Sequence, residues 1–180
     1  MGSWSMDDTS AGGRAKDKAL AARWRGAAEA IEALAGTRSL DAVINVLRAF
    51  ARRVVGADGI AIVLPDGDRC HYVAEDAMEP LWEGQYFPAS SCVSGWAMKH
   101  RDTAVIGTVF DDPRVPVDAY RTTFVRSMVM VPIGQVEPIA AIGAYWSEAW
   151  QPSDDEIALL EALARAAAVA LENERLAKRT

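Results

Sequence analysis

The sequence predicts an α+β domain in which an antiparallel sheet of five to six strands is combined with helices from both ends of the chain. Two pairs of short apolar segments predict the sheet, 59–64 with 69–74 and 127–133 with 139–146. One-sided apolar patterns before the first pair and after the last pair predict the helices. Strands that meet through hairpins run antiparallel, so the sheet belongs to this class.

Helices are expected at 16–35, from Ser39 to Gly56, and from Ser153 to about residue 178. Ser39 is placed to cap the second helix, and Ser153 with Glu156 forms a capping box at the start of the last one. The first and last helices carry apolar residues at alternating spacings of three and four, which is typical of helices that pack together. These residues are Leu20, Trp24, Ala27, Ile31 and Leu34 in the first helix, and Ile157, Leu160, Ala164, Ala167 and Leu171 in the last.

Turn residues delimit the strands. The run Pro65-Asp66-Gly67-Asp68 joins the first pair, and Gly134 with Glu137-Pro138 bounds the connection in the second pair. The segment between the two hairpins is less regular. It is expected to contain loop over most of 75–91, a short helix at 95–100, a short strand at 103–106, irregular chain at 107–119 and a helical turn at 118–124.

Composition excludes several classes of function. The net charge is −6 and no basic tract occurs, so the chain lacks the electrostatic footprint of a nucleic-acid-binding protein. No apolar run approaches the ~20 residues of a membrane span, and the N-terminus lacks the pattern of a signal peptide. With only two cysteines, we expect a cytoplasmic protein with free thiols.

Several segments resemble the GAF domain family, and most closely the GAF domains of bacterial sensor histidine kinases. The resemblance rests on Pro80-Leu81-Trp82-Glu83-Gly84-Gln85, on the segments 91–101 and 111–133, and on Ala-Ile-Gly-Ala-Tyr-Trp at 141–146. It implies a PAS-related fold with a six-stranded antiparallel sheet. The terminal helices would pack on one face, and loops and short helices from 75–126 would roof a ligand pocket on the other. The sixth strand is then Tyr86-Phe87 or another part of that loop.

The resemblance also sets the expected domain boundaries. We expect a disordered leader or vector-derived remnant at 1–15, with Met6 as an alternative start, and a signalling or dimerisation helix at 16–36. The GAF domain is expected at 37–171 and a C-terminal helical extension at 172–180.

The candidate ligand site is a group of aromatic residues in the roof segments with one arginine beside them. Aromatic walls with a few polar groups are typical of small-molecule pockets, but the same rings could simply cover the open face of the sheet. Arg126 could bind an anionic ligand or could be an ordinary surface residue. The candidates are Trp82, Tyr86, Trp96, Tyr120, Phe124 and Arg126.

Other chemistries have weaker support. A Cys-His pair carries a covalent bilin in phytochrome-type GAF domains, but Cys70-His71 follows a tight turn in a predicted strand, so bilin attachment at Cys70 is not expected. No metal-ligand spacing occurs. Free methionine sulfoxide reductases share the GAF fold and use a cluster of cysteines that this chain lacks. No catalytic residue, metal or cofactor is therefore predicted, and the chain is not expected to be an enzyme.

The expected function is sensory or regulatory. A small molecule or partner would bind under the roof, and the terminal helices would transmit the change to a histidine kinase or other output domain in cis or in trans. Dimer contacts are expected from Leu20, Trp24, Ile31, Leu34, Ile157, Leu160 and Leu171. The alternatives are a ligand-free dimerisation module, a bilin-binding protein and a thiol-redox protein.

Overall fold

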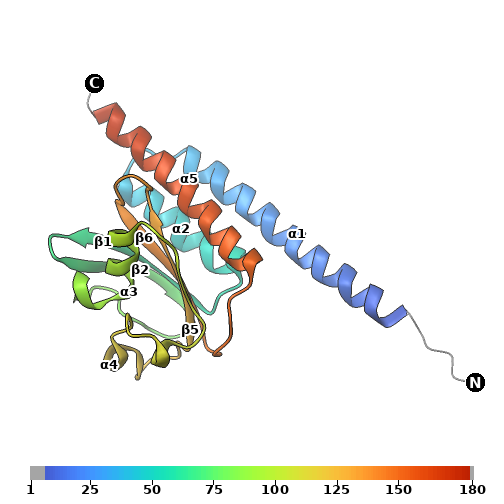
Figure 1. Ribbon diagram of the computed structural model, residues 1–180. Coiled ribbons are helices and arrows are strands. Elements are labelled where there is room, and N and C mark those ends of the chain that lie inside the picture. The colour runs from blue at the N-terminus through green and yellow to red at the C-terminus, as the bar shows by residue number, and fades with distance from the viewer. Residues whose placement is uncertain (1–6, 179–180) are drawn as a thin grey trace, which may run out of the picture.

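The computed structural model describes residues 7–178, with side chains described from residue 12 onward. Three long helices and a six-stranded sheet form the body of the protein (Figure 1). The helices are α1 (Asp7–Ala35), α2 (Leu40–Val55), α3 (Val93–His100), α4 (Val117–Tyr120) and α5 (Asp154–Lys178), with short 3₁₀ turns η1 (Ala89–Ser91) and η2 (Val109–Asp111). The strands are β1 (Gly59–Asp66), β2 (Arg69–Ala77), β3 (Tyr86–Pro88), β4 (Ala104–Ile106), β5 (Ser127–Ile133) and β6 (Ala140–Trp146).

The sheet has the order β3-β2-β1-β6-β5-β4, and every neighbouring pair is antiparallel. Both predicted hairpins, β1–β2 and β5–β6, are present. The sixth strand is β3, where Tyr86 pairs with His71 and Phe87 with Cys70. The central pair, β1 and β6, brings the two hairpins together, because Ile62 lies opposite Ile142. The predicted antiparallel α+β fold is confirmed.

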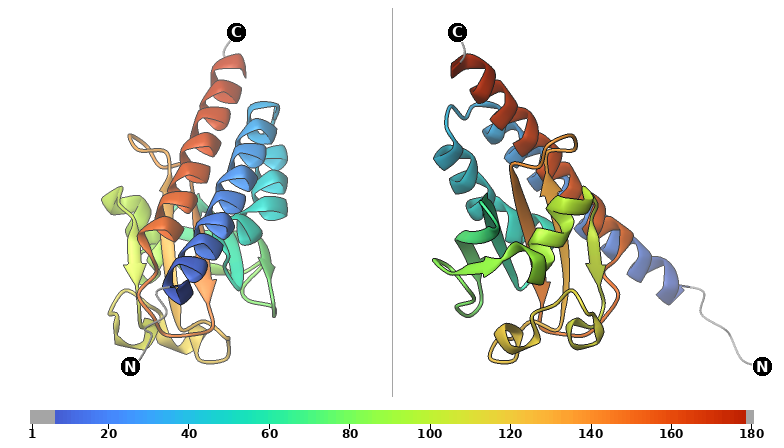
Figure 2. Two further views of the ribbon diagram at one scale, coloured as in Figure 1. Left: turned by 90° about the vertical axis from the view of Figure 1, so that its right-hand side faces the viewer. Right: turned by 60° about the vertical axis from the view of Figure 1, so that its left-hand side comes forward.

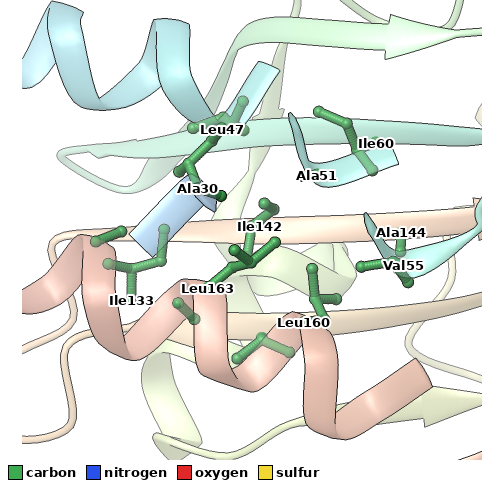
Figure 3. Close-up of a cluster of buried hydrophobic side chains, with 14 of the residues drawn as sticks. Ala30, Leu47, Ala51, Val55, Ile60, Ile133, Ile142, Ala144, Leu160 and Leu163 are labelled. Carbon is green, nitrogen blue, oxygen red and sulfur yellow. The ribbon is translucent and has the colours of Figure 1, made fainter. Parts of the chain in front are cut away.

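Helices α1, α2 and α5 cover one face of the sheet (Figures 1 and 2). Their core contains Leu47 from α2 and Leu160 and Leu163 from α5, packed against Ile60 and Ile142 of the sheet (Figure 3). These five side chains are at most 1% exposed. Removing such aliphatic side chains from water is the main stabilising contribution in a core of this kind.

The other face of the sheet lies under a roof made of the loops and short elements between β2 and β5. Along β6, Ala141 and Tyr145 point to the roof while Ile142 and Ala144 point to the helices, as the two-residue period of a strand requires. The same strands therefore carry two separate hydrophobic cores. The expectation that the end helices lie opposite the 75–126 loops is confirmed.

Several element boundaries differ from the predicted ones. Helix α1 begins at Asp7, so residues 7–15 of the expected leader are helical, and residues 1–6 lie outside the described residues. Gly12 and Gly13 disfavour a helix, but a helix anchored by packing farther along the chain gains a hydrogen bond for each residue added. Helix α4 ends at Tyr120, before the predicted end at 124, because the N–H and Oγ1 of Thr123 both donate to the Tyr120 carbonyl.

The predicted caps are present. The Ser39 side chain accepts a hydrogen bond from the Ala42 N–H at 3.1 Å, and Gly56 ends α2 at φ 75°. At the start of α5, Ser153 Oγ accepts from the Glu156 N–H and Glu156 Oε1 accepts from the Ser153 N–H, at 3.1 and 2.8 Å. Short helix α3 begins at Val93, two residues before the predicted start, because Cys92 is the extended residue that precedes it.

Candidate functional site

An aromatic cluster fills the centre of the roof. The Trp82 ring lies 4.6 Å from Tyr120, 5.3 Å from Tyr145 and 5.7 Å from Tyr72, measured between ring centroids. All four side chains are at most 3% exposed. We call these four residues the roof cluster. Its side chains come from two strands of the sheet, one loop and α4, so the cluster joins the sheet to the roof.

Glu75 holds the loop that carries Trp82. Its carboxylate accepts hydrogen bonds from three successive backbone N–H groups, those of Leu81 at 2.7 Å, Trp82 at 2.9 Å and Glu83 at 2.7 Å. The Trp82 Nε1–H then donates to the carbonyl of Ala119 at 3.1 Å, at the edge of α4. Hydrogen bonds to a charged acceptor are stronger than neutral ones. The loop is therefore tied to both β2 and α4.

The roof cluster places hydroxyl groups inside an apolar core. Tyr72 OH lies 3.2 Å from Ser94 Oγ, and Tyr120 OH makes only a weak contact with Met128 Sδ at 3.5 Å. Tyr145 OH is buried and has no hydrogen-bond partner among the described residues. An unpaired buried hydroxyl costs about 1–3 kcal/mol, so this position is energetically unfavourable as it stands.

The absence of a side chain at Gly143 makes room for the Tyr145 hydroxyl. A Cβ atom at position 143 would lie 2.5 Å from Tyr145 Oη and 2.9 Å from Met130 Cε. The tyrosine ring thus folds back over its own strand instead of standing away from the sheet. Burial raises the pKa values of Tyr72, Tyr120 and Tyr145 above their ordinary value. All three hydroxyls consequently stay protonated and can donate hydrogen bonds.

A pair of cysteines lies beside the roof cluster. Cys70 on β2 is fully buried and Cys92, just before α3, is 3% exposed; both are free thiols. Both belong to the buried cluster on the roof side of the sheet, and Cys92 Sγ is 3.4 Å from Ser94 Oγ. Since Ser94 also contacts Tyr72 OH, the Cys92 thiol connects to the roof cluster through one hydroxyl.

The structure brings three of the six predicted ligand residues into the roof core. Trp82 and Tyr120 belong to the roof cluster, and Phe124 packs near Gly59, whose Cβ position lies 3.0 Å from Phe124 Cζ. Side chains of the protein itself occupy this space: Met128 and Met130 from β5 are fully buried in the same core.

The other three predicted residues lie on the outside of the roof. Tyr86 is 44% exposed and stacks on His71 with a centroid distance of 4.1 Å. Trp96 is half-buried and stacks on His100, whose Nδ1 donates to the Trp96 carbonyl at 2.9 Å. Arg126 donates through Nη1 to the carbonyls of Thr123 and Val125 at 2.9 and 2.8 Å. These contacts are structural and do not place the three side chains toward a common ligand.

Ion pairing also stiffens the outside of the roof. Arg114 forms a bidentate pair with Asp112, with Nε–Oδ1 at 2.9 Å and Nη2–Oδ2 at 2.7 Å, and its guanidinium lies 4.4 Å from the Trp96 ring centroid. The hydrogen bonds from Arg114 lower the pKa of Asp112 below its ordinary value.

Sequence reasoning did not select Tyr72, Tyr145, Ser94 or the cysteine pair as one group. The signal in the sequence was the two-residue period of a strand, which places every second side chain on the same face of the sheet. Cys70 and Tyr72 share one face of β2, and Ala141 and Tyr145 share one face of β6. Ser94 could not be found in this way, because its position depends on how α3 lies across the sheet.

The predicted dimer residues separate into buried and exposed sets. Leu34, Leu160 and Leu171 lie in the helix-side core of their own chain, so they are not available to a partner. Leu20 and Ile157 are partly buried against the same core. Trp24 and Ile31 are 40% and 38% exposed. The apolar stripe predicted on the first helix therefore does not lie on one face.

Among residues 7–178, no three histidine, cysteine, aspartate or glutamate side chains gather into a possible metal site. In the same described part of the chain, no helix combines the length and apolar character needed to cross a bilayer.

Comparison with known proteins gives the family and the fold. The model of the GAF domain family matches residues 37–172. The free methionine-R-sulfoxide reductase from Neisseria meningitidis, solved in complex with its substrate, is 20% identical, with 88% of this chain and 93% of that chain covered and a TM-score of 0.75. No protein among those with curated descriptions matches.

The GAF domains of two larger proteins are similar to the chain as well. The GAF domain of a phosphoenolpyruvate-protein phosphotransferase from Acinetobacter is 12% identical over 88% of this chain and 98% of that chain, with a TM-score of 0.71. The GAF domain of a two-component sensor histidine kinase from Bacillus halodurans is 21% identical over 79% of this chain and 99% of that chain, with a TM-score of 0.65. At these identities the likeness concerns the fold alone.

Proposed function

Because the chain belongs to the GAF domain family, we propose that it is a sensory module that binds a small molecule in the roof and signals through its terminal helices to a histidine kinase output domain. Membership of the family supports a sensory or regulatory role, and the similar folds include regulatory domains of a kinase and of a phosphotransferase. The ligand, the output domain and a cytoplasmic location are parts of the proposal.

The observation that carries the proposal is the double-sided sheet. On β6, Tyr145 belongs to the roof cluster while its neighbour Ala144 packs under the helices. Closely packed cores transmit displacements because they have few voids. A ligand that displaces Tyr145 would therefore shift the strand on which the helices pack, and it would favour one arrangement of the helices over another.

The roof chemistry suggests the class of ligand. Tyr72, Tyr120 and Tyr145 offer protonated hydroxyls within an otherwise apolar wall. Such a site suits an uncharged, mostly apolar molecule that carries one or two hydrogen-bond acceptors. The unpaired Tyr145 hydroxyl would gain a partner when such a ligand binds.

The terminal helices supply the proposed output. Helices α1 and α5 run side by side along the back of the sheet, and the N-terminal part of α1 extends past the body (Figures 1 and 2). Five residues of α1 form an outward-facing stripe at spacings of three and four: Ala21, Trp24, Ala28, Ile31 and Ala35. All five are exposed, which is unusual for two large apolar side chains on one line. A second copy of the chain would cover this stripe.

A thermal-shift screen tests ligand binding. A compound at 100 times its Kd stabilises the folded state by about 2.7 kcal/mol, which raises the Tm of a domain of this size by roughly 5–10 °C. Trp82→Ala should abolish the shift, and Glu29→Ala, on the exposed surface of α1, should preserve it. A hit whose effect survives Trp82→Ala would place the ligand elsewhere and refute the roof site.

Sedimentation tests the dimer. The double variant Trp24→Glu and Ile31→Glu should be monomeric where the unmodified chain and the Glu29→Ala control are dimeric. A dimer that persists in the double variant would contradict the proposed interface. A dimer that dissociates in this variant, together with a screen without hits, would favour the ligand-free dimerisation module.

An enzymatic role is the competing reading, because a reductase of free methionine-R-sulfoxide has a similar fold. We propose that this chain is not such an enzyme, since the roof core around Trp82, Tyr120 and Tyr145 is apolar, which suits an uncharged ligand and disfavours a charged free amino acid. Incubation of the protein with free methionine-R-sulfoxide and dithiothreitol should give no methionine above the rate without protein. Turnover that is lost in Cys92→Ser would overturn this view.

A further inference from the structure

We propose that a groove on the helix side of the sheet binds a free α-amino acid with an aliphatic side chain. The groove has a volume of about 200 Å³ and lies where the end of α3 and the start of β4 meet α5 and the β5–β6 connection. Val131 and Ala164, which line it, also belong to the helix-side core. The groove is therefore separate from the roof cluster, and the proposal does not rest on a roof ligand.

Two arginines in this groove have no partner. Arg101 directly follows α3 and Arg165 lies in α5, and both line the groove. Neither guanidinium forms an ion pair or a hydrogen bond with the part of the chain that the structure describes. Guanidinium groups bind carboxylates through two parallel hydrogen bonds. The two arginines are therefore available to the carboxylate of a ligand.

Thr103 explains why the arginines are unpaired. Glu161 and Arg165 are four residues apart in α5 with the glutamate first, a spacing that favours an ion pair on a helix. Glu161 Oε2 instead accepts a hydrogen bond from Thr103 Oγ1 at 3.1 Å. In the same way, Asp102 Oδ1 accepts from the Thr103 N–H at 2.9 Å and does not pair with Arg101 beside it. Thr103 thus engages both carboxylates of the groove.

The backbone at Arg101 points to a use for its side chain. Arg101 has φ 55° and ψ 43°, and between residues 7 and 178 it is the only residue other than glycine with a positive φ. Its N–H donates to the Ala97 carbonyl and so ends α3. Glycine is the usual residue at such a position, because a Cβ atom is unfavourable in the left-handed conformation. Unfavourable backbone conformations of this kind concentrate at functional sites.

The two carboxylates complete a site for a zwitterion. Asp102 Oδ2 and Glu161 Oε1 accept no hydrogen bond from the described residues, so each is free to accept one from an ammonium group. The groove carries two positive and two negative side chains, so a simple anion or a simple cation would be repelled by half of them. The adjacent ammonium and carboxylate groups of an α-amino acid match both kinds of charge.

The apolar part of the groove selects the side chain. Pro132 and Ala168 line it, and Ala168 also borders a neighbouring hollow of about 440 Å³ that includes Val136, Ile139 and Val169. An aliphatic side chain placed there would remove exposed apolar surface from water, since Val136 is 82% and Val169 61% exposed. The bound amino acid would also connect the end of α3 to α5, the helix proposed to carry the output.

Isothermal titration calorimetry with three matched compounds tests the site. L-Leucine carries both charged groups, 4-methylpentanoate lacks the amino group, and 3-methylbutylamine lacks the carboxylate. We expect L-leucine to bind at a single site per chain and the other two at least roughly tenfold more weakly, because each loses hydrogen bonds between charged groups. Equal affinity for 4-methylpentanoate and L-leucine would overturn the zwitterion site. An absence of binding heat up to the solubility limit of L-leucine would overturn it as well.

Single variants assign the contacts. Arg165→Gln and Arg101→Gly should each weaken L-leucine binding at least roughly tenfold. Arg101→Gly should do so without lowering the Tm, since glycine is favoured at this φ, and this separates loss of the ligand from loss of the fold. Glu161→Gln should weaken binding of L-leucine but not of 4-methylpentanoate.

The matched control is Arg121→Gln. Arg121 lies on the exposed surface after α4, where it pairs with Asp118, and its replacement removes the same charge far from the groove. This variant should bind L-leucine as the unmodified chain does. If binding of L-leucine survives both Arg101→Gly and Arg165→Gln, or if Arg121→Gln weakens it equally, the groove is not the site.

Discussion

Gly95 occupies the interior of α3 at a place where the chain of η1 passes unusually close. A Cβ atom at position 95 would lie 2.6 Å from the carbonyl carbon of Ala89 and 2.8 Å from its Cα, and would be closer still to the carbonyl oxygen. All three are backbone atoms, so no side-chain rotation can relieve the overlap. Replacing Gly95 with alanine therefore requires that α3 and η1 move apart.

Two effects oppose each other in Gly95→Ala. Alanine is favoured over glycine in a helix interior by about 1 kcal/mol, while overpacking of a closely packed site costs about 1–3 kcal/mol and sometimes more. Because the new Cβ atom would overlap the Ala89 backbone, we expect overpacking to cost about 3 kcal/mol of the free energy of unfolding, against the ~1 kcal/mol gained in helix propensity. The net loss in the free energy of unfolding is then about 2 kcal/mol, equal to a fall in Tm of roughly 4–8 °C.

Urea unfolding followed by circular dichroism measures this change. The control is Gly13→Ala in α1, where a Cβ atom would have no neighbour within 4 Å, and this variant should be as stable as the unmodified chain or slightly more stable. If Gly95→Ala were as stable as the control, the close contact between α3 and η1 would not exist in solution.

Three further changes test the roof. Tyr145→Phe removes a buried hydroxyl that has no partner among the described residues, so unfolding experiments should find stability unchanged or increased by up to about 1 kcal/mol. Glu75→Gln removes the charged acceptor of all three backbone donors and replaces one of the two oxygens with an NH2 group that cannot accept, so it should cost about 1–3 kcal/mol, with altered Trp82 fluorescence. Asp112→Asn should destabilise at neutral pH. Because Arg114 holds the pKa of Asp112 below its unfolded value, this contribution is present above the unfolded pKa and lost as the pH falls through the folded one. The free energies of unfolding of the unmodified chain and of Asp112→Asn, measured by urea titration, should therefore become equal in acid.

Local patterns in the sequence predicted much of the fold. The hairpin turn before Arg69 and the capping box at Ser153 involve residues only a few positions apart, so the signals for them lie within short segments. The long helices and the hairpin strands follow from apolar periods of the same short range. Resemblance to a known family supplied the arrangement of the two faces.

The site depended on contacts between distant segments. No local pattern in the sequence indicates that Ser94 meets Tyr72, or that Trp82 lies between Tyr120 and Tyr145, because these contacts arise only when the loops fold over the paired strands. The predicted pocket residues were selected as aromatics in loops, and a loop position does not say whether a ring turns inward, as Trp82 does, or outward, as Tyr86 does.

The apolar residues of α1 also show what the sequence predicts and what only the fold decides. The sequence by itself determined that α1 is an amphipathic helix, because its period is a property of neighbouring residues. Only the tertiary structure decided that Leu34 packs inside the chain while Trp24 and Ile31 face outward, since α2 and α5 together cover one side of α1 and leave the adjacent line of side chains exposed.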